Sequence, residues 1–185
     1  PGLELGAYEE LWAQEGAPFK RLAEMFRGSL DGLPSTFVNL DVAKARMAEV
    51  RNVFARKKLP DAGFIVRGTL DYPEALLDAK NPVQFLYYRG NLELLSSPVR
   101  VALVGSREAS EEGVRRARKL AKLLVKDGAT VVSGLAKGID TAAHEAAIES
   151  GGNTIGVIGT PISETYPREN AKLQEFIAHR HLLVS

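Results

Sequence analysis

Apolar residues recur at three- and four-residue intervals in two segments of the first 60 residues, 19–26 and 43–54. This spacing places them on one face of an α-helix, so each segment is predicted to form a short amphipathic helix. A stretch rich in glycine, serine and proline at 28–35 separates the two segments and predicts a loop. We therefore expect residues 1–60 to form a small helical N-terminal region.

The apolar pattern changes at residue 61, where short runs typical of β-strands replace the helical spacing. Two such runs, at 64–66 and 83–88, flank a short helix predicted at 74–79. The apolar runs that follow have the length of buried strands and lie at 99–104, 130–133, 154–158 and 182–184. Helical spacing fills the intervals between them, at 111–127, at 139–150 and after Pro167.

Strands that alternate with helices form a parallel sheet with right-handed crossovers. The predicted fold is therefore α/β, a Rossmann-like parallel sheet with flanking helices, and residues 61–185 are expected to form this domain. The clearest helix, 111–127, has Ser110 as its N-cap and Gly128 at its end. The apolar stripe of this helix consists of Val114, Ala117, Leu120, Ala121, Leu124 and Val125.

Ligands of an open parallel sheet bind beyond the carboxyl ends of its strands, so the loops after the predicted strands are the candidate sites. The first loop, 105–110, combines Gly105, the hydroxyls of Ser106 and Ser110, and the permanent cation of Arg107. Glycine permits a close backbone approach, and the helix that follows offers free N–H groups. The guanidinium binds oxyanions in bidentate fashion, so this loop is predicted to cradle an anion.

The second loop, 133–140, repeats this arrangement, because Gly134 and Gly138 lie on either side of Lys137 ahead of another helix. Both loops follow strands of one sheet, so Arg107 and Lys137 are expected to meet at one crevice. Two cations at one crevice favour a phosphate or a polyanion as the ligand.

A third loop, 159–167, is long for a connection of this kind and is expected to close over the crevice. Tyr166 is a candidate for stacking on a nucleobase, and we place Asn170 with it as a base-stacking or lid residue. The alternative for Tyr166 is a packing role, which is more common for an isolated tyrosine.

Signatures of several other sites are missing from the sequence. It has no Gly-x-Gly-x-x-Gly after the first strand of the parallel series, no P-loop and no hydrolase Gly-x-Ser-x-Gly. Asp140 and His144 are four residues apart on one helix face, which allows a catalytic base but favours a local hydrogen bond or a cap. No catalytic residue is predicted, and the protein is not expected to be an enzyme.

Composition narrows the class of protein further. The 185 residues include no cysteine and three histidines, so no disulfide, thiolate metal site or cysteine nucleophile is expected, and no metal is predicted. The apolar runs are too short for a membrane helix and no leader opens the chain, which predicts a cytoplasmic protein. Lysine and arginine total 24 against 23 acidic residues, but residues 100–137 hold nine basic and four acidic residues. The cations are thus concentrated around the first two loops.

The same loops resemble a known family, the DprA/Smf family of DNA-processing proteins. The residues that carry the resemblance are Gly105-Ser106-Arg107 with Ser110, the string Ser-Gly-Leu-Ala-Lys-Gly-Ile-Asp-Thr-Ala-Ala-His at 133–144, and Tyr166-Pro167-x-x-Asn170. Upstream, Asp71-Tyr72-Pro73 and Leu86-Tyr87-Tyr88-Arg89-Gly90 fit the same family. The resemblance covers residues 62–185.

The resemblance implies a Rossmann-like protein without a cofactor that binds single-stranded DNA, protects incoming strands during natural transformation and assists in loading RecA onto them. It assigns the contacts with the DNA backbone to Arg107 and Lys137. It assigns the shaping of the phosphate-binding loops to Ser106, Ser110, Gly134 and Gly138. The family's domain continues past the equivalent of Ser185, where its dimer contacts are assigned, so we expect a domain incomplete at its C-terminal end and a homodimer that depends on that further part.

Two other functions fit parts of the sequence. Enzymes of the lysine-decarboxylase-like Rossmann group hydrolyse nucleoside monophosphates with a Pro-Gly-Gly-x-Gly-Thr-x-x-Glu motif. Here Gly159-Thr160 is followed by Glu164 one residue late, and the preceding glycines are missing. A one-residue shift moves a carboxylate by about 3 Å, which spoils its placement. The other alternative is a receptor that binds a small nucleotide with the same two loops.

Overall fold

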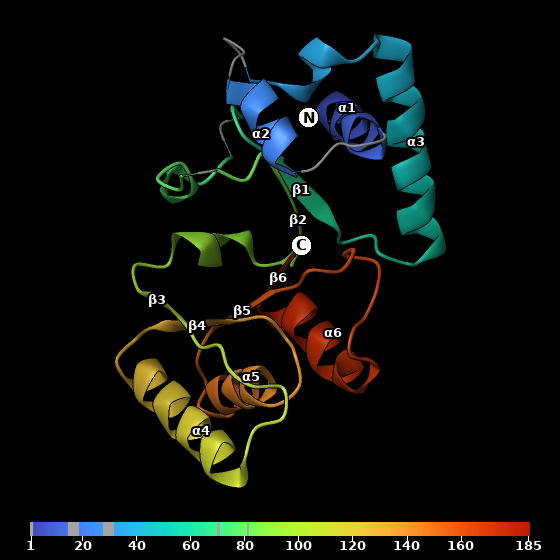
Figure 1. Cartoon of the computed structure of the whole chain (residues 1–185). Helices are drawn as coiled ribbons and strands as arrows, with labels where there is room; N and C mark the ends of the chain where they lie inside the picture. The colour runs from blue at the N-terminus through green and yellow to red at the C-terminus, as the bar shows by residue number, and fades with distance from the viewer. Residues whose placement is uncertain (1, 15–18, 28–31, 70, 81) are drawn as a thin grey trace. The chain divides into compact units, whose positions relative to one another are not determined.

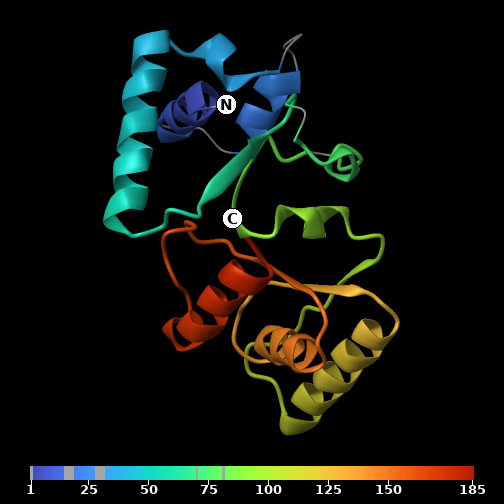
Figure 2. The same ribbon diagram turned by 180° about the vertical axis from the view of Figure 1, so that it is seen from behind.

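The computed structural model describes residues 2–14, 19–27, 32–69, 71–80 and 82–185 (Figure 1 and, from behind, Figure 2). Residues 28–31 of the predicted N-terminal loop lie outside the described residues. The chain forms two compact units, Pro1–Tyr87 and Tyr88–Ser185. The assignment of residues 61–185 to one domain stays a prediction, made from the change of pattern at residue 61.

The first unit contains the predicted helical region. Its elements are α1 (Gly2–Ala13), α2 (Phe19–Arg27), η1 (Pro34–Phe37), α3 (Leu40–Arg56), β1 (Gly63–Val66) and η2 (Glu74–Leu76). The apolar spacing does not predict helix α1, because this helix buries residues on several sides, among them Glu4, Leu5 and Ala7. Gly6 lets α1 pack closely on α3, since a Cβ there would lie 1.8 Å from the backbone oxygen of Ala43.

The core of the first unit is built from stacked aromatic rings. Tyr8 stacks on Phe85 with ring centroids 4.6 Å apart, and Phe64 stacks on the same ring at 5.5 Å. Burial raises the pKa of Tyr8 to about 12. The hydroxyl of Tyr87 donates a 2.6 Å hydrogen bond to the carboxylate of Glu9. Aromatic packing thus joins α1 to the strands of this unit.

The second unit contains the parallel sheet. Its strands lie in the order β2-β6-β5-β4-β3. They are β2 (Phe85–Gly90, which begins in the first unit), β3 (Arg100–Ala102), β4 (Thr130–Ser133), β5 (Thr154–Val157) and β6 (Leu182–Val184). The pairs β3–β4, β4–β5 and β5–β6 are parallel. The pair of β2 and β6 is antiparallel, with Tyr88 opposite Val184. The sequence predicts a parallel sheet, and this pair is an exception.

Three helices connect the parallel strands: α4 (Glu111–Lys126), α5 (Ile139–Glu149) and α6 (Ala171–Arg180). Each connection moves one strand further in the same direction, so right-handed crossovers place all three helices on one face of the sheet (Figure 1). Two short helices, η3 (Leu92–Ser96) and η4 (Arg168–Asn170), lie in the connections. The predicted α/β, Rossmann-like architecture with a helical N-terminal region is confirmed.

The start of α4 follows the sequence closely. The hydroxyl oxygen of Ser110 accepts a 3.2 Å hydrogen bond from the backbone N–H of Gly113, which satisfies one free donor of the first turn. Ala121 is completely buried in a cluster with Val131 of β4. Leu120 is predicted to face inward but is 46% exposed, because small alanines form the face that meets the sheet.

Candidate functional site

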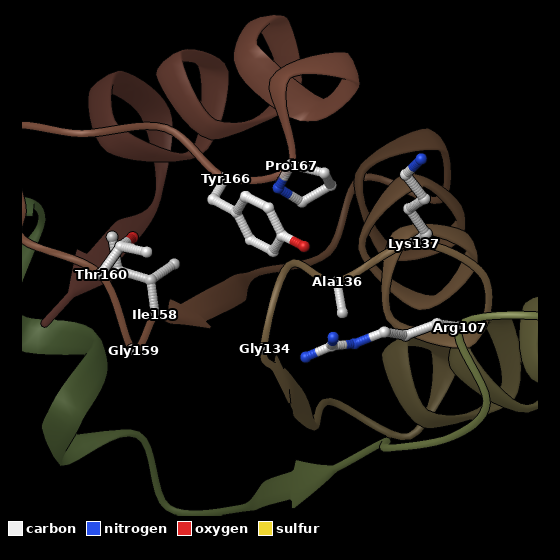
Figure 3. A pocket seen from close by; sticks show the side chains of 9 residues that line it. All are labelled: Arg107, Gly134, Ala136, Lys137, Ile158, Gly159, Thr160, Tyr166 and Pro167. Atoms are coloured by element: carbon white, nitrogen blue, oxygen red, sulfur yellow. The ribbon is translucent and has the colours of Figure 1, made fainter.

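A pocket of about 250 Å³ lies beyond the carboxyl ends of β3, β4 and β5 (Figure 3). All three predicted loops contribute to its lining, as expected for an open parallel sheet. The lining residues are Arg107, Gly134, Ala136, Lys137, Ile158, Gly159, Thr160, Tyr166 and Pro167. The structure therefore brings together four of the predicted site residues: Arg107, Gly134, Lys137 and Tyr166.

The first loop is closed by short-range hydrogen bonds. The hydroxyl oxygen of Ser106 accepts a 3.1 Å bond from the N–H of Glu108, and Ser110 caps α4. Gly105 and both serines lie beside the pocket rather than in its lining. These residues shape the turn that carries Arg107, whose side chain is exposed.

Glycines allow the first and second loops to touch. Gly138 has φ +79°, and a Cβ on it would lie 2.3 Å from the backbone oxygen of Ser106. The N–H of Ile139 donates a 3.2 Å hydrogen bond to the same oxygen. Gly105 packs on the side chain of Ile139, where a Cβ would come within 2.6 Å. The two loops thus form one wall, as their position at the ends of neighbouring strands predicts.

Buried polar groups hold the second loop from beneath. One carboxylate oxygen of Asp140 accepts a 3.1 Å hydrogen bond from the N–H of Gly134, and Asp140 is only 4% exposed. Next to it, Leu135 is fully buried with φ +59°, a left-handed conformation that is uncommon for leucine. Several contacts are therefore needed to hold this backbone.

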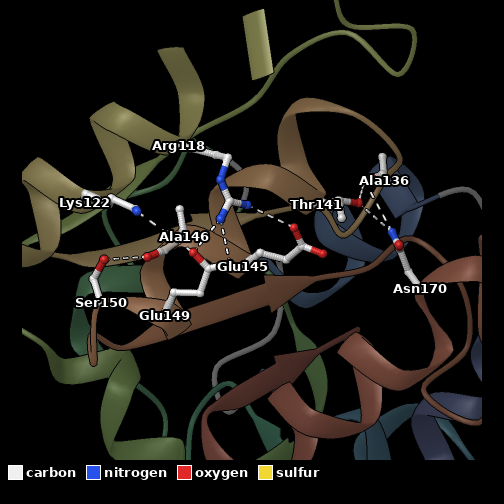
Figure 4. A network of polar contacts seen from close by, with 9 residues as sticks. All are labelled: Arg118, Lys122, Ala136, Thr141, Glu145, Ala146, Glu149, Ser150 and Asn170. Atoms are coloured by element: carbon white, nitrogen blue, oxygen red, sulfur yellow. Dashed lines mark hydrogen bonds and ion pairs between the residues drawn. The ribbon is translucent and has the colours of Figure 1, made fainter. Parts of the chain in front are cut away.

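Asn170 supplies two of those contacts. Its amide donates 2.8 Å hydrogen bonds to the carbonyl of Leu135 and to the hydroxyl of Thr141. The Thr141 hydroxyl in turn donates to the carbonyl of Ala136, at 2.7 Å (Figure 4). The sequence groups Asn170 with Tyr166 as a stacking or lid residue, but Asn170 is only 7% exposed and its amide is occupied. The structure places it under the second loop as a support.

The two cations of the site differ in their partners. Lys137 Nζ lies 2.5 Å from a carboxylate oxygen of Glu169, and this contact raises the pKa of Lys137 and lowers that of Glu169. Among the residues that the structure describes, Arg107 has no acidic partner within ion-pair distance. Figure 3 shows the guanidinium of Arg107 extending toward the pocket, whereas the amine of Lys137 points away from the pocket. Both residues are exposed, and among the described residues Arg107 reaches the pocket without an acidic partner, whereas Lys137 is paired with Glu169.

Most other cations around the first two loops are paired with acids. On α4, Arg115 and Arg116 contact Glu112. Arg118 reaches across to α5, where its guanidinium lies 3.1 Å from Glu145 and 2.5 Å from Glu149 (Figure 4). The acids of α5 lie outside the basic segment 100–137. The local excess of basic residues thus overstates the positive charge that is free near the pocket.

His144 has a structural environment. It is fully buried on α5, and its Nδ1 lies 2.7 Å from the hydroxyl of Thr154. That hydroxyl donates to the carbonyl of Val131, so Nδ1 carries the proton that His144 donates to Thr154. Burial lowers the pKa of His144 to about 4. The sequence favours a local hydrogen bond or a cap for Asp140 and His144 over a catalytic base. Asp140 accepts a hydrogen bond from Gly134, and His144 bonds to Thr154 of β5.

Further residues of the pocket lie in or next to the third loop. Gly159, Thr160 and Pro167 belong to motifs of the sequence but not to the predicted site, and they line the pocket together with Ile158, which no motif includes. The buried hydroxyl of Thr160 has no hydrogen-bond partner among the described residues. The position of the loop after a parallel strand is the signal that could have found them. Glu164, the candidate acid of the alternative enzyme, does not line the pocket.

Neither a metal centre nor a membrane span is found in the described part of the chain. No group of histidine, aspartate or glutamate side chains there could hold a metal ion. None of the described helices has the length and hydropathy needed to cross a bilayer.

The fold and the site define an α/β protein of Rossmann-like topology with a basic pocket at the carboxyl ends of its parallel strands. The family model of DNA recombination-mediator protein A matches residues 63–185, and the chain belongs to this family. The resemblance to DprA/Smf proteins deduced from the loop residues is thereby confirmed.

Relatives in this family are similar over part of their length. DNA processing protein DprA of Streptococcus pneumoniae is 46% identical over 114 residues, which are 62% of this chain and 40% of that protein. Protein Smf of Escherichia coli is 39% identical over 102 residues, 55% of this chain and 27% of that protein. The chain thus spans less than half the length of these relatives.

Solved structures agree with the fold. The X-ray structure of DNA processing protein A from Streptococcus pneumoniae matches with a TM-score of 0.64 and 35% identity, over 89% of this chain and 55% of that one. DNA processing protein A from Helicobacter pylori, whose structure concerns its single-stranded DNA-binding mode, matches with a TM-score of 0.58. Its identity is 32%, over 67% of this chain and 54% of that one.

Proposed function

We propose that this chain binds single-stranded DNA at the pocket formed by the three strand-end loops, as part of DNA processing during natural transformation. The observation that carries the proposal is Arg107, an exposed cation that extends toward the pocket with no acidic partner among the described residues. A phosphodiester supplies the anion that such a guanidinium binds in bidentate fashion. The single-stranded DNA-binding mode of the Helicobacter pylori relative supports this ligand.

The remaining parts of the pocket suit a nucleic-acid strand. Gly134 brings backbone close to the ligand, and Lys137 provides a second cation at the rim. Tyr166 is 62% exposed, so its ring is available to stack on a base. Base stacking tolerates any sequence, because every base has a π-face. We therefore expect binding that depends on phosphate and on unpaired bases and is tolerant of sequence.

The wider role in the cell belongs to the same proposal. A protein that binds incoming strands in the cytoplasm protects them by occupancy and presents them to RecA, and neither step requires chemistry by this chain. We propose that it acts without enzymatic activity, since Glu164 lies outside the pocket lining. A homodimer and a contact with RecA are proposed for the protein together with the further regions that its relatives have.

The test is a fluorescence-anisotropy titration of oligo-dT and of a duplex of equal length at several salt concentrations. We expect tighter binding of the single strand, with a log–log salt slope that flattens by about 0.7 for each phosphate-binding cation that a substitution removes. The variant Arg107→Ala/Lys137→Ala should lose most of the affinity. Its matched control is Lys119→Ala/Lys126→Ala, which removes two exposed charges from α4 instead.

The outcome separates the three candidate functions. Unchanged affinity in the Arg107→Ala/Lys137→Ala variant would show that the strand binds elsewhere. Competition by thymidine monophosphate as effective as that by oligo-dT would indicate a receptor for a small nucleotide. Release of free base from a nucleoside monophosphate, abolished by Glu164→Gln, would establish the hydrolase.

A further inference from the structure

Glu169 is the acidic residue that touches the proposed DNA site. It lies in η4, and one of its carboxylate oxygens is 2.5 Å from Lys137 Nζ. Both side chains are more than half exposed. Neither charge is therefore buried in a way that would require a partner of opposite sign. Such an exposed pair is weak and exchanges readily with other ions.

The backbone around Glu169 is fixed relative to Lys137. The next residue, Asn170, is buried and binds the carbonyl of Leu135, two residues before Lys137. Pro167, two residues before Glu169, is also buried and lines the pocket. The backbone that carries the Glu169 carboxylate is thus positioned near the Lys137 amine by the same contacts that hold the second loop.

A DNA phosphate that binds Lys137 encounters this carboxylate. Both groups are anions, and they cannot share the single amine at contact distance without repulsion. The amine contacts Glu169 and points away from the pocket (Figure 3). Binding of a phosphate through Lys137 therefore requires that the amine leave Glu169 and turn toward the ligand.

We propose that Glu169 competes with the DNA phosphate for Lys137: its carboxylate holds the amine until a strand binds, and it thereby lowers the affinity for the strand. The inference rests on the proposed function, because it names the regulation of the same site. Its consequence is faster release of bound strands, a property suited to a protein that hands DNA to another. Arg107, without such a competitor among the described residues, provides the anchoring contact.

The experiment compares oligo-dT affinity in a double-mutant cycle of Glu169→Gln and Lys137→Ala. Glutamine keeps the shape of the exposed side chain, so the fold is expected to be unaffected. We expect Glu169→Gln to tighten binding roughly two- to fivefold, the range for release of an exposed ion pair. In the Lys137→Ala background, Glu169→Gln should change oligo-dT affinity only by the small amount expected when one acidic charge that does not contact the DNA is removed.

The matched control for that charge is Glu164→Gln, which removes an exposed acid from the third loop that does not line the pocket. The inference is overturned if Glu169→Gln binds no tighter than Glu164→Gln, or if its effect persists without Lys137. In either case a loss of affinity in Lys137→Ala leaves the proposed function intact. Absence of oligo-dT binding by the wild-type chain would overturn the proposed function and this inference with it.

Discussion

The first and second loops follow neighbouring strands of one sheet and carry one cation each, but they are built in different ways. The side-chain bonds of the first loop are short-range, from the N–H of Glu108 to Ser106 and from the N–H of Gly113 to Ser110. The second loop is bonded to η4, which lies more than 30 residues further along the chain. Asn170 donates to the carbonyl of Leu135, and Glu169 pairs with Lys137. Arg107 thus extends toward the pocket without an acidic partner among the described residues, whereas Lys137 is held in an ion pair.

Gly138 lies where the two loops touch, so a substitution there should have the largest effect on both of them. Gly138→Ala puts a Cβ 2.3 Å from the Ser106 oxygen at a backbone φ of +79°. We expect a loss of about 2 to 5 kcal/mol in the free energy of unfolding, from the left-handed backbone and from the clash together. Urea denaturation measures it, and oligo-dT affinity should fall as the loops separate.

The control for Gly138→Ala is Gly128→Ala. Gly128 has the same φ of +79°, but a Cβ there would meet nothing within 4 Å. Gly128→Ala should therefore lose less stability, about 1 to 2 kcal/mol for alanine in the left-handed region, and keep its DNA affinity. Equal losses in the two variants would mean that contact between the loops contributes nothing.

Acid should destabilise the fold through the helix that follows the second loop, whereas the first loop holds no buried ionisable group. His144 lies on α5, which follows the second loop, and burial lowers its pKa from 6.5 to about 4. Between these values the unfolded chain binds a proton that the folded chain excludes, so stability falls as the pH falls from about 6.5 to 4. The expected loss is about 3 kcal/mol. Both ionisable residues of the first loop, Arg107 and Glu108, are exposed.

Urea unfolding of the wild type and of His144→Gln across this pH range checks the assignment. The variant loses the bond to Thr154 and is less stable at neutral pH, but its stability should depend much less on pH. Burial also lowers the pKa of His181, and ion pairs lower the pKa values of Glu169 and Glu149, so these groups contribute to the slope that remains in the variant. A variant with the full wild-type slope would exclude His144 as the titrating group.

The ranking of the two cations tests the comparison directly. Arg107→Ala should weaken oligo-dT binding about tenfold, as expected for a charge-assisted contact, and flatten the salt slope by about 0.7. Lys137→Ala should weaken it less, roughly two- to threefold, because Glu169 competes with the phosphate for the amine. Lys119→Ala controls for the removal of one exposed charge. A larger effect of Lys137→Ala than of Arg107→Ala would reverse the roles assigned to the loops.

The sequence is sufficient to predict what depends on local pattern. Alternating strands and helices define the Rossmann-like unit, and glycines at two strand ends locate Arg107 and Lys137 at one pocket. Helix α1 is not predicted because its residues are buried on several sides, so its apolar positions do not follow a helical spacing. In the sequence Gly6 suggests a break in the helix, whereas in the structure it allows α1 to pack closely on α3. The antiparallel pairing of β2 with β6 is not predicted because strands distant in the chain carry no local mark of their partners.

Long-range polar partners are the part of the site that the sequence does not predict. A charge count over 100–137 finds the basic excess but assigns no partners, so the ion pair of Lys137 with Glu169 is missed. Asn170 belongs to a motif near Tyr166, and its position in the sequence suggests a lid. Its actual bonds reach back to Leu135 and Thr141, because the turn before α6 folds under the second loop.

The smallest effect is expected at Arg118, a cation of the same basic segment that is paired with acids of α5. Its guanidinium contacts Glu145 and Glu149, and its side chain is 29% exposed. Because solvent screens these pairs, Arg118→Ala should lower the melting temperature by only about 2 to 4 °C. The difference from the wild type should shrink in high salt.

Arg118→Ala also allows a cation that is held in ion pairs to be compared with Arg107, which extends toward the pocket. Arg118 does not line the pocket, so Arg118→Ala should leave oligo-dT affinity and its salt slope unchanged. Arg107→Ala should show the reverse pattern, with reduced affinity and an unchanged melting temperature, since no ion pair in the described residues depends on it. Calorimetry and anisotropy on the two variants measure both quantities. A fall in affinity for Arg118→Ala equal to that for Arg107→Ala would mean that the DNA responds to the total charge of the segment rather than to the placement of one guanidinium.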